Sequence, residues 1–313
     1  NHLCGCRLLR QRDVIQPRGP KDALRLAWWM LRHEQRSLLL ASALCLLSLP
    51  VNDSLAAVLL PNDLLEVLGF LLAFFLGFRY SQAYNRWWEA RILWGALVNE
   101  SRNWRDLLTT VLPRRSSLAV RQRLLQLEVL LIWCVNASLR NPDDRIERLP
   151  AAVQDFAESL GLHDPSVQQV MQAMACRQRE LVEQQQLNSI ERADLIHVQQ
   201  ELTRAIGGLE RIRAQPLPAS STLCIRGLTW VYGYLVFLKL DALGLLSTAV
   251  VGWLAFLTLL MAERIGMFLE NPFRDPRFAL PLDQICQVIS ANLLGGDHPL
   301  AQRKTNHHGP VVT

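Results

Sequence analysis

Residues 64–94, LLEVLGFLLAFFLGFRYSQAYNRWWEARILW, constrain the fold of this chain more than any other stretch. Their first half is apolar enough to enter a bilayer, whereas the second half turns polar and cationic at Arg79. Phe70, Phe74 and Phe78 recur every four residues, so on a helix they form one stripe about one turn apart. The stretch predicts one helix that leaves a membrane and continues into water.

The composition also indicates a membrane protein. Half of the 313 residues are hydrophobic and only 19% are charged, compared with about 25% in soluble proteins. The net charge of +5 comes almost entirely from arginines that flank apolar segments, which favours membrane anchoring over nucleic-acid binding. Seven scattered cysteines give no disulfide framework, and Cys4 and Cys6 lack the further ligands of a metal site. The polar, basic start does not resemble a cleavable signal peptide.

Apolar runs and helix signals predict an all-α chain with four membrane helices. The predicted order is a basic arm at 1–26 whose first part is extended or disordered, two membrane helices within 27–82, a helical cytosolic region at 83–222, two membrane helices within 223–263, cytosolic helices at 264–295 and a flexible tail at 296–313. The first apolar run, Ser37–Val51, is shorter than the roughly 20 residues of a membrane span. It becomes long enough only if the arginines before it lie along the membrane and extend their charged ends to water. Asp63 and Glu66 form a capping-box pattern at the start of the second span.

Arginine placement predicts the topology. The arm and the segment after Arg79 are rich in arginine, whereas residues 50–63 contain no Lys or Arg. The positive-inside rule therefore puts both termini and the long middle segment in the cytoplasm.

Within the middle segment, several helices are expected. Leu118–Leu139 is charged at its start, so a buried cytosolic helix is preferred over a membrane span. Val153–Leu160 and Pro165–Gly207 are predicted to be amphipathic helices, the second interrupted at Gly207 and Gly208. In the last predicted span, Ala242–Met261, the charges of Glu263 and Arg264 are expected to end the helix.

The Phe stripe has two interpretations. It packs against lipid or other helices, or it forms a hydrophobic constriction that gates a pore by dewetting, which requires several subunits. Glu66 lies one turn before Phe70 on the same stripe, and an ionisable residue at that depth faces water or protein. If Glu66 faces water, so does the stripe, and a ring of such carboxylates at a pore mouth favours cations.

The remaining motifs indicate structure rather than chemistry. Arg86, Trp87, Trp88, Glu89 and Arg91 match no catalytic or phosphate-binding pattern, and Glu89 could pair with Arg86 or Arg91, either within the helix or between subunits. The sequence contains no recognisable nucleotide loop, HExxH motif or plausible Ser/His/Asp set. We therefore expect neither an enzyme nor a bound metal or cofactor.

The string FLGFRYSQAYNRWWEARILWGALVNESRNW at 75–104 closely resembles the signature of the bestrophin family, in its bacterial branch. A second string, FLENPFRDPRFALPLDQICQVI at 268–289, is similar to the family's segment after the fourth span, and Q-P-L-P at 215–218 also fits. The resemblance implies a homopentameric ion channel in a bacterial inner membrane. It implies a pore neck at Phe70, Phe74 and Phe78, and a cytosolic aperture at Leu217, before Pro218.

The resemblance also bears on the ion. Animal members carry an acidic Ca²⁺ clasp after the fourth helix, but the matching region here, Glu270–Asp283, has few acids. The resemblance and Glu66 together predict a channel for small monovalent ions that selects cations such as Na⁺ or K⁺. The alternatives are an anion (chloride) channel, or a non-conducting membrane scaffold or regulator.

Overall fold

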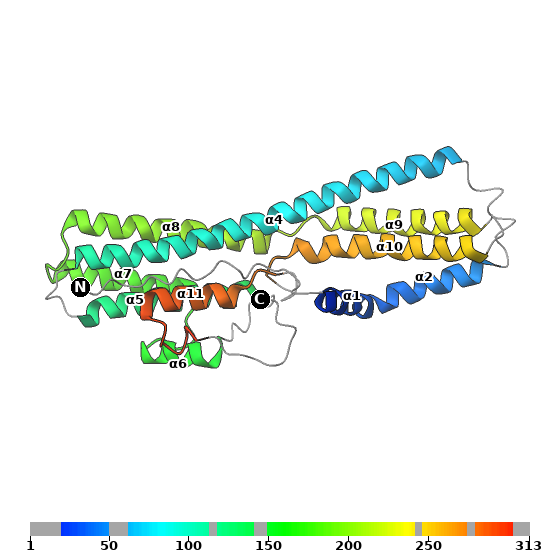
Figure 1. The fold of residues 1–313 in the computed structure, drawn as a ribbon. Helices are drawn as coiled ribbons and strands as arrows, with labels where there is room; N and C mark the ends of the chain where they lie inside the picture. The colour runs from blue at the N-terminus through cyan, green and yellow to red at the C-terminus, as the bar shows by residue number, and fades with distance from the viewer. Residues whose placement is uncertain are drawn as a thin grey trace. The chain divides into compact units, whose positions relative to one another are not determined.

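The computed structural model describes residues 20–49, 62–112, 118–140, 149–241, 246–273 and 279–302. All regular elements in these ranges are helical, in agreement with the predicted fold class (Figure 1). The chain divides into two compact units. The first unit contains residues 1–73, 225–264 and 306–313, and the second contains residues 74–224 and 265–305.

Apolar helices build the first unit. It contains α1 (Pro20–His33), α2 (Gln35–Ser48), the start of α4 (Asn62–Val111), most of α9 (Ala219–Asp241) and most of α10 (Leu246–Glu270). Its core is Ala41, Cys45, Phe237, Leu238, Phe256 and Leu260. The helices α9 and α10 run side by side in Figure 1, and a Cβ placed at Gly233 would lie 2.2 Å from the Phe256 ring. Small residues of this kind allow apolar helices to pack closely.

Three of the described helices are long and apolar enough to cross a membrane, namely Asp63–Val111, Ala219–Leu240 and Ala249–Glu270. The predicted first span is not among them, because α2 is an apolar helix of only 14 residues. A bilayer-spanning helix needs about 20 residues. A fourth span therefore stays a prediction.

The second unit surrounds helix α5 (Leu118–Arg140). The other helical parts are the rest of α4, α6 (Ala151–Ser159), α7 (Val167–Glu183), α8 (Ser189–Ala214), the start of α9, the end of α10, and α11 (Leu282–Leu294). Fifteen side chains of α5 are buried, and α5 packs mainly against α11 and α7. The predicted buried helix at 118–139 is therefore confirmed, since an apolar helix surrounded by other helices satisfies its whole surface.

The predicted break at Gly207 and Gly208 is wrong, since α8 continues through both residues. A Cβ at Gly208 would lie 2.8 Å from the Leu93 side chain, so glycine allows α8 to approach α4 closely. The break comes earlier, between α7 and α8, where Gln185 has a φ of 56°. Asn188 then caps α8 in a capping box with Glu191.

Three helix boundaries bear on the predictions. The arm is helical from Pro20, while Cys4, Cys6 and the end of the predicted tail (303–313) lie outside the described residues. Helix α4 begins at Asn62, as predicted, and Asp63 lies in its first turn rather than at the capping position. Helix α10 continues to Glu270 because Arg264, 2.9 Å from the Glu34 carboxylate, has a buried partner. Charges that are paired need not end an apolar helix.

Candidate functional site

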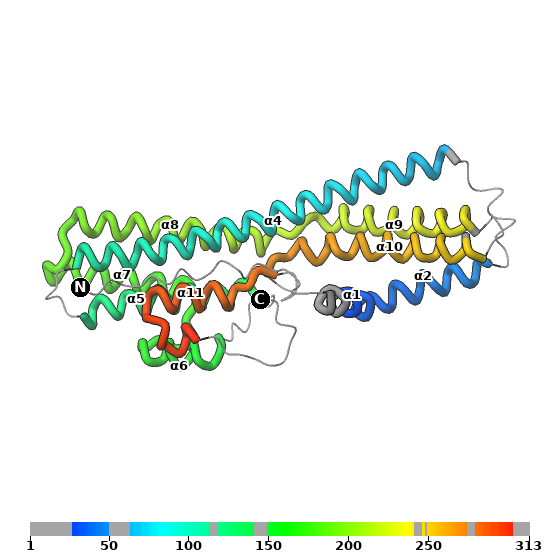
Figure 2. The backbone as a smooth tube through the Cα atoms, viewed as in Figure 1, coloured from blue at the N-terminus to red at the C-terminus, as the bar shows by residue number. Residues whose placement is uncertain are grey.

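Helix α4 has one face buried in its own chain, and the helix is continuous from Asn62 to Val111 (Figure 2). The buried residues are Leu72, Arg79, Ala83, Ala90, Trp94, Leu97, Ser101, Trp104 and Leu108. From Ala83 onward they are separated by seven, four or three residues, the repeat that keeps one side of a helix against its neighbours. The opposite side of α4 is left exposed by the part of the chain that the structure describes.

The Phe stripe lies on that exposed side. Phe70, Phe74 and Phe78 are 71%, 52% and 55% exposed, and Glu66 is also exposed. Phe70 and Phe74 each stand two residues from buried Leu72, which is about 200° around a helix. The Phe74 and Phe78 ring centroids are 4.9 Å apart. The stripe is thus a continuous apolar ridge that the described residues leave largely open.

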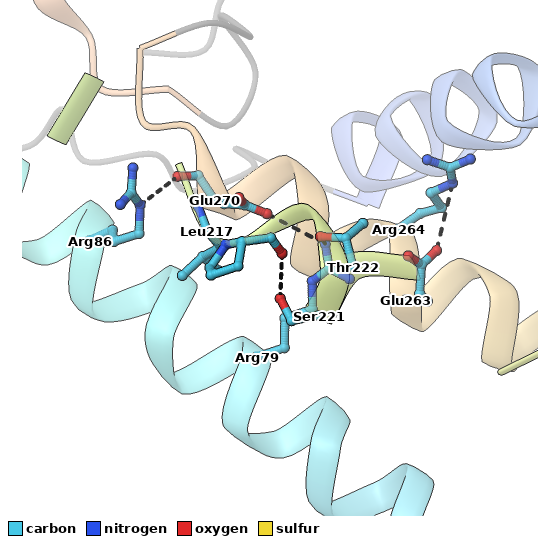
Figure 3. A network of polar contacts seen from close by, with 9 residues as sticks. Arg79, Arg86, Leu217, Ser221, Thr222, Glu263, Arg264 and Glu270 are labelled. Atoms are coloured by element: carbon cyan, nitrogen blue, oxygen red, sulfur yellow. Dashed lines mark hydrogen bonds and ion pairs between the residues drawn. The ribbon is translucent and has the colours of Figure 1, made fainter. Parts of the chain in front are cut away.

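Arg79 follows the stripe directly but points to the buried side of α4. Its Nη2 lies 3.4 Å from Glu270 Oε2 and donates to Thr222 Oγ1 at 3.3 Å. Its side chain is only 3% exposed, so the guanidinium is held inside the second unit and does not extend the Phe ridge (Figure 3).

Arg86 holds three carbonyl oxygens at helix ends. It donates to Ile212 and Gln215 at the end of α8, at 2.6 and 2.5 Å, and to Glu270 at the end of α10, at 3.3 Å. A guanidinium at the C-terminus of a helix satisfies carbonyls that have no partner within the helix. Arg86 thus connects the ends of α8 and α10 to α4.

Within this chain, Glu89 does not form the pair with Arg86 or Arg91 that the motif suggested, and a pair between subunits stays a prediction. Glu89 pairs with Arg211 on α8, because Arg86 is engaged by carbonyls. The Arg91 guanidinium instead lies 5.9 Å from the centre of the Trp87 ring. Trp88 stacks on Tyr84 with ring centroids 6.3 Å apart, so both tryptophans of the motif take part in aromatic packing along α4.

Leu217 lies in the four-residue connection between α8 and α9 and is half-buried. Its backbone N–H donates to Glu270 Oε1 at 3.1 Å, so Glu270 holds both Leu217 and Arg79. Figure 3 shows Leu217 and Arg79 converging on Glu270, and Arg86 beside it. Sequence reasoning missed Glu270, because nothing near it in the chain indicates a partner 53 residues away.

Glu128 is a second residue that sequence reasoning missed. It is fully buried on α5, and Ser101 on α4 donates to its Oε1 at 2.8 Å, while Oε2 has no hydrogen-bond partner among the described residues. Burial raises the pKa of Glu128 to about 7, the Ser101 hydroxyl opposes this rise, and Glu100 adds to it. The available signal was a single acid within the apolar run LQLEVLL.

The described residues contain no group of three or more His, Cys, Asp or Glu side chains that could hold a metal ion. Asp275 lies outside the described ranges, and Asp283 accepts hydrogen bonds from Asn136 at 2.8 Å and Arg140 at 3.0 Å. The acids on either side of the segment that resembles the Ca²⁺ clasp, Glu270 and Asp283, are thus both bound to donors of this chain.

Residues 32–295 match the model of a family described as bacterial/fungal bestrophin protein. The chain belongs to this family.

Three relatives are named voltage-dependent anion channel-forming proteins. That of Synechocystis is 29% identical over 79% of this chain and 77% of its own length. That of Mesorhizobium japonicum is 31% identical over 72% of each. YneE of Escherichia coli is 28% identical over 73% and 74%.

Solved structures agree with this membership. A crystal structure of a bacterial bestrophin homologue from Klebsiella pneumoniae has 27% sequence identity and a TM-score of 0.68. The similarity covers 84% of this chain and 98% of that one. A crystal structure described as that of a membrane protein, carrying one glycine-to-alanine substitution, gives 26% identity, a TM-score of 0.71 and coverage of 85% and 100%. The resemblance that the sequence motifs indicate is therefore confirmed.

Proposed function

We propose that this chain is a subunit of a bestrophin-type ion channel whose pore is lined by α4 and is narrowest at Phe70, Phe74 and Phe78. The observation that supports it is the exposed Phe ridge opposite the buried side of the same helix. In a homopentamer with α4 around its axis, this ridge would face the water-filled pore. Rings of apolar side chains in a narrow pore stop conduction by dewetting.

Anions are the first candidate for the conducted ion. The relatives with channel names are described as anion channel-forming. A phenylalanine that projects toward a pore axis turns its ring edge to the ion, and the edge carries the positive part of the ring quadrupole. Chloride passing rings of Phe70, Phe74 and Phe78 would meet this positive edge.

Cations are the second candidate because Glu66 is exposed one turn before Phe70. A ring of carboxylates at the mouth of a pore attracts cations. Arg79 does not oppose it with a ring of positive charge, since its guanidinium is buried beside Glu270. The sign of the permeant ion thus depends on whether the ring edges or the carboxylates dominate.

Flux through liposomes that contain the purified full chain tests the proposal. Phe74→Ala should raise the flux by widening the neck, and Phe75→Ala is the matched control. Phe75 is also exposed on α4 but lies about 100° away from the stripe. Equal effects of the two substitutions would contradict the Phe neck. If neither wild type nor the variant with Phe70, Phe74 and Phe78 all replaced by alanine conducts ions, the channel proposal is rejected and the non-conducting scaffold remains.

Reversal potentials across bilayers in asymmetric NaCl settle the sign. Glu66→Gln should shift the potential toward the chloride equilibrium value if carboxylates contribute to selection. An unchanged potential in a chloride-selective wild type would show that Glu66 does not select the ion.

A further inference from the structure

Glu270 is the last residue of α10, and its carboxylate has two partners, one on α4 and one in the connection between α8 and α9. One oxygen, Oε1, accepts the Leu217 N–H at 3.1 Å, and the other, Oε2, lies 3.4 Å from Arg79. The Glu270 side chain is 15% exposed and that of Arg79 is 3% exposed. A charge pair with so little water is screened weakly, so breaking one side leaves an uncompensated charge on the other.

The connection that carries Leu217 has few means of holding its shape. Pro216 and Pro218 have no N–H, so Leu217 supplies the single backbone donor of these three residues. That donor goes to Glu270. Before it, Gln215 is fixed through its carbonyl by Arg86, at 2.5 Å. Glu270 and Arg86 together thus fix the connection on both sides of Pro216.

We infer that Glu270 is a positioning residue that sets the place of Leu217 and couples it to the helix that carries Phe78. Phe78 and Arg79 are neighbours on α4, so a rotation or shift of α4 that moves the Phe78 ring also moves the Arg79 guanidinium. The Glu270 carboxylate follows its partner, and the Leu217 N–H follows the carboxylate. The inference rests on the proposed function, in which Phe78 and Leu217 form two constrictions of one pore.

The chemistry explains why glutamate suits this position. A carboxylate accepts two hydrogen bonds from different directions and carries the charge that Arg79 requires. Glutamine keeps an oxygen for Leu217, but it turns an NH₂ donor toward Arg79 and loses the charge attraction. Alanine removes both contacts, so the two substitutions separate the hydrogen bond from the charge pair.

Hydrogen exchange of the Leu217 amide in the purified full chain tests the coupling without any ion flux. Glu270→Ala should accelerate this exchange by about tenfold or more, as expected for the loss of a charge-assisted hydrogen bond. Arg79→Gln should also accelerate it, although the hydrogen bond of Leu217 is to Glu270, because a carboxylate without its cation turns to water. Arg102→Gln on exposed α4 surface is the control and should leave the rate unchanged.

A purely local role for Glu270 predicts faster exchange in Glu270→Ala and no change in Arg79→Gln, which would overturn the coupling. Unchanged exchange in a folded Glu270→Ala variant would overturn the positioning role as well. Glu270→Gln keeps the volume and one acceptor, so it provides a second test if the alanine variant fails to fold. Its Leu217 exchange should lie between wild type and Arg79→Gln, and exchange equal to wild type would refute the need for the charge.

Permeability to a large ion relative to a small one provides the functional arm. Leu217→Ala and Glu270→Ala should each raise the thiocyanate-to-chloride ratio, or the ratio of an organic cation to Na⁺ in a cation channel. The double variant should give no more than the larger single effect, because both act on one constriction. Additive effects would show that Glu270 acts elsewhere. Absence of flux in wild type would reject the proposed function while the exchange result would still stand.

Discussion

Replacing Glu128 with glutamine should remove a pH dependence from the stability of the second unit. In the folded chain, burial raises the pKa of Glu128 to about 7, compared with the ordinary value of 4.5. Between these two values the unfolded chain is ionised at this position while the folded chain keeps its proton. The unfolded state thus binds fewer protons, and the free energy of unfolding falls as pH rises from about 4.5 to about 7.

The size of the effect follows from the gap between the two pKa values. Each unit is worth roughly 1.4 kcal/mol, so the fully developed loss is about 3 kcal/mol above pH 7. Glutamine resembles the protonated carboxyl and keeps an oxygen for the Ser101 hydroxyl. Glu128→Gln should therefore match wild type within about 1 kcal/mol at pH 5 and exceed it by about 3 kcal/mol at pH 8.

Urea unfolding of the full chain in detergent, followed by tryptophan fluorescence, measures this difference. Trp94 and Trp104 are buried in the second unit and report its unfolding. With a slope of about 2 kcal/mol per molar urea, 3 kcal/mol moves the midpoint by about 1.5 M. Glu158→Gln, an exposed glutamate on α6, is the matched control and should show the same small difference at both pH values. A Glu128→Gln midpoint shift that is equal at pH 5 and pH 8 would refute the reasoning.

Four further substitutions, at three positions, test the packing of α4 and α8. Gly208→Val should destabilise the second unit by about 1–3 kcal/mol, because the added side chain overlaps Leu93. A Cβ at Gly207 would face open space, so Gly207→Ala should stabilise α8 by up to about 1 kcal/mol. A lower urea midpoint for Gly207→Ala than for Gly208→Val would contradict the packing. Arg86→Ala should cost about 2–4 kcal/mol through lost carbonyl contacts, and Arg86→Lys should recover less than half in the same measurement, because an ammonium lacks the planar fork.

The sequence predicted features that depend on neighbours within a few turns. The long helix through Arg79 and the buried helix at 118–139 follow from periodicity, which is visible in a window of about 15 residues. The Phe ridge follows in the same way, since Phe70, Phe74 and Phe78 are one turn apart. The family motif at 75–104 was specific enough to identify the family, which the match over 32–295 confirms.

The contacts around Glu270 could not be predicted, because its partners are distant in the chain. Arg79 is 191 residues away and Leu217 is 53 residues away, and no local pattern connects them. At Gly208, by contrast, a local pattern was present but led to a wrong prediction. A glycine pair in a helical segment usually signals a break, yet here the tertiary contact with Leu93 requires the missing Cβ. At this position, packing between α8 and α4 determines the backbone conformation more than local propensity does.

The positions of Phe78 and Arg79 limit how a neck on α4 could open. Consecutive residues lie about 100° apart on a helix, so Phe78 can be exposed while Arg79 is buried. Rotating α4 to withdraw Phe78 would also pull Arg79 from Glu270 and Thr222, and separating a buried charge pair costs about 3–5 kcal/mol. A rotamer change of Phe78 breaks neither contact, because an exposed ring moves on its own Cβ. In a channel of the proposed kind, side-chain motion at Phe78 is therefore the less costly opening step, and a helix rotation is favoured only when Leu217 moves with it.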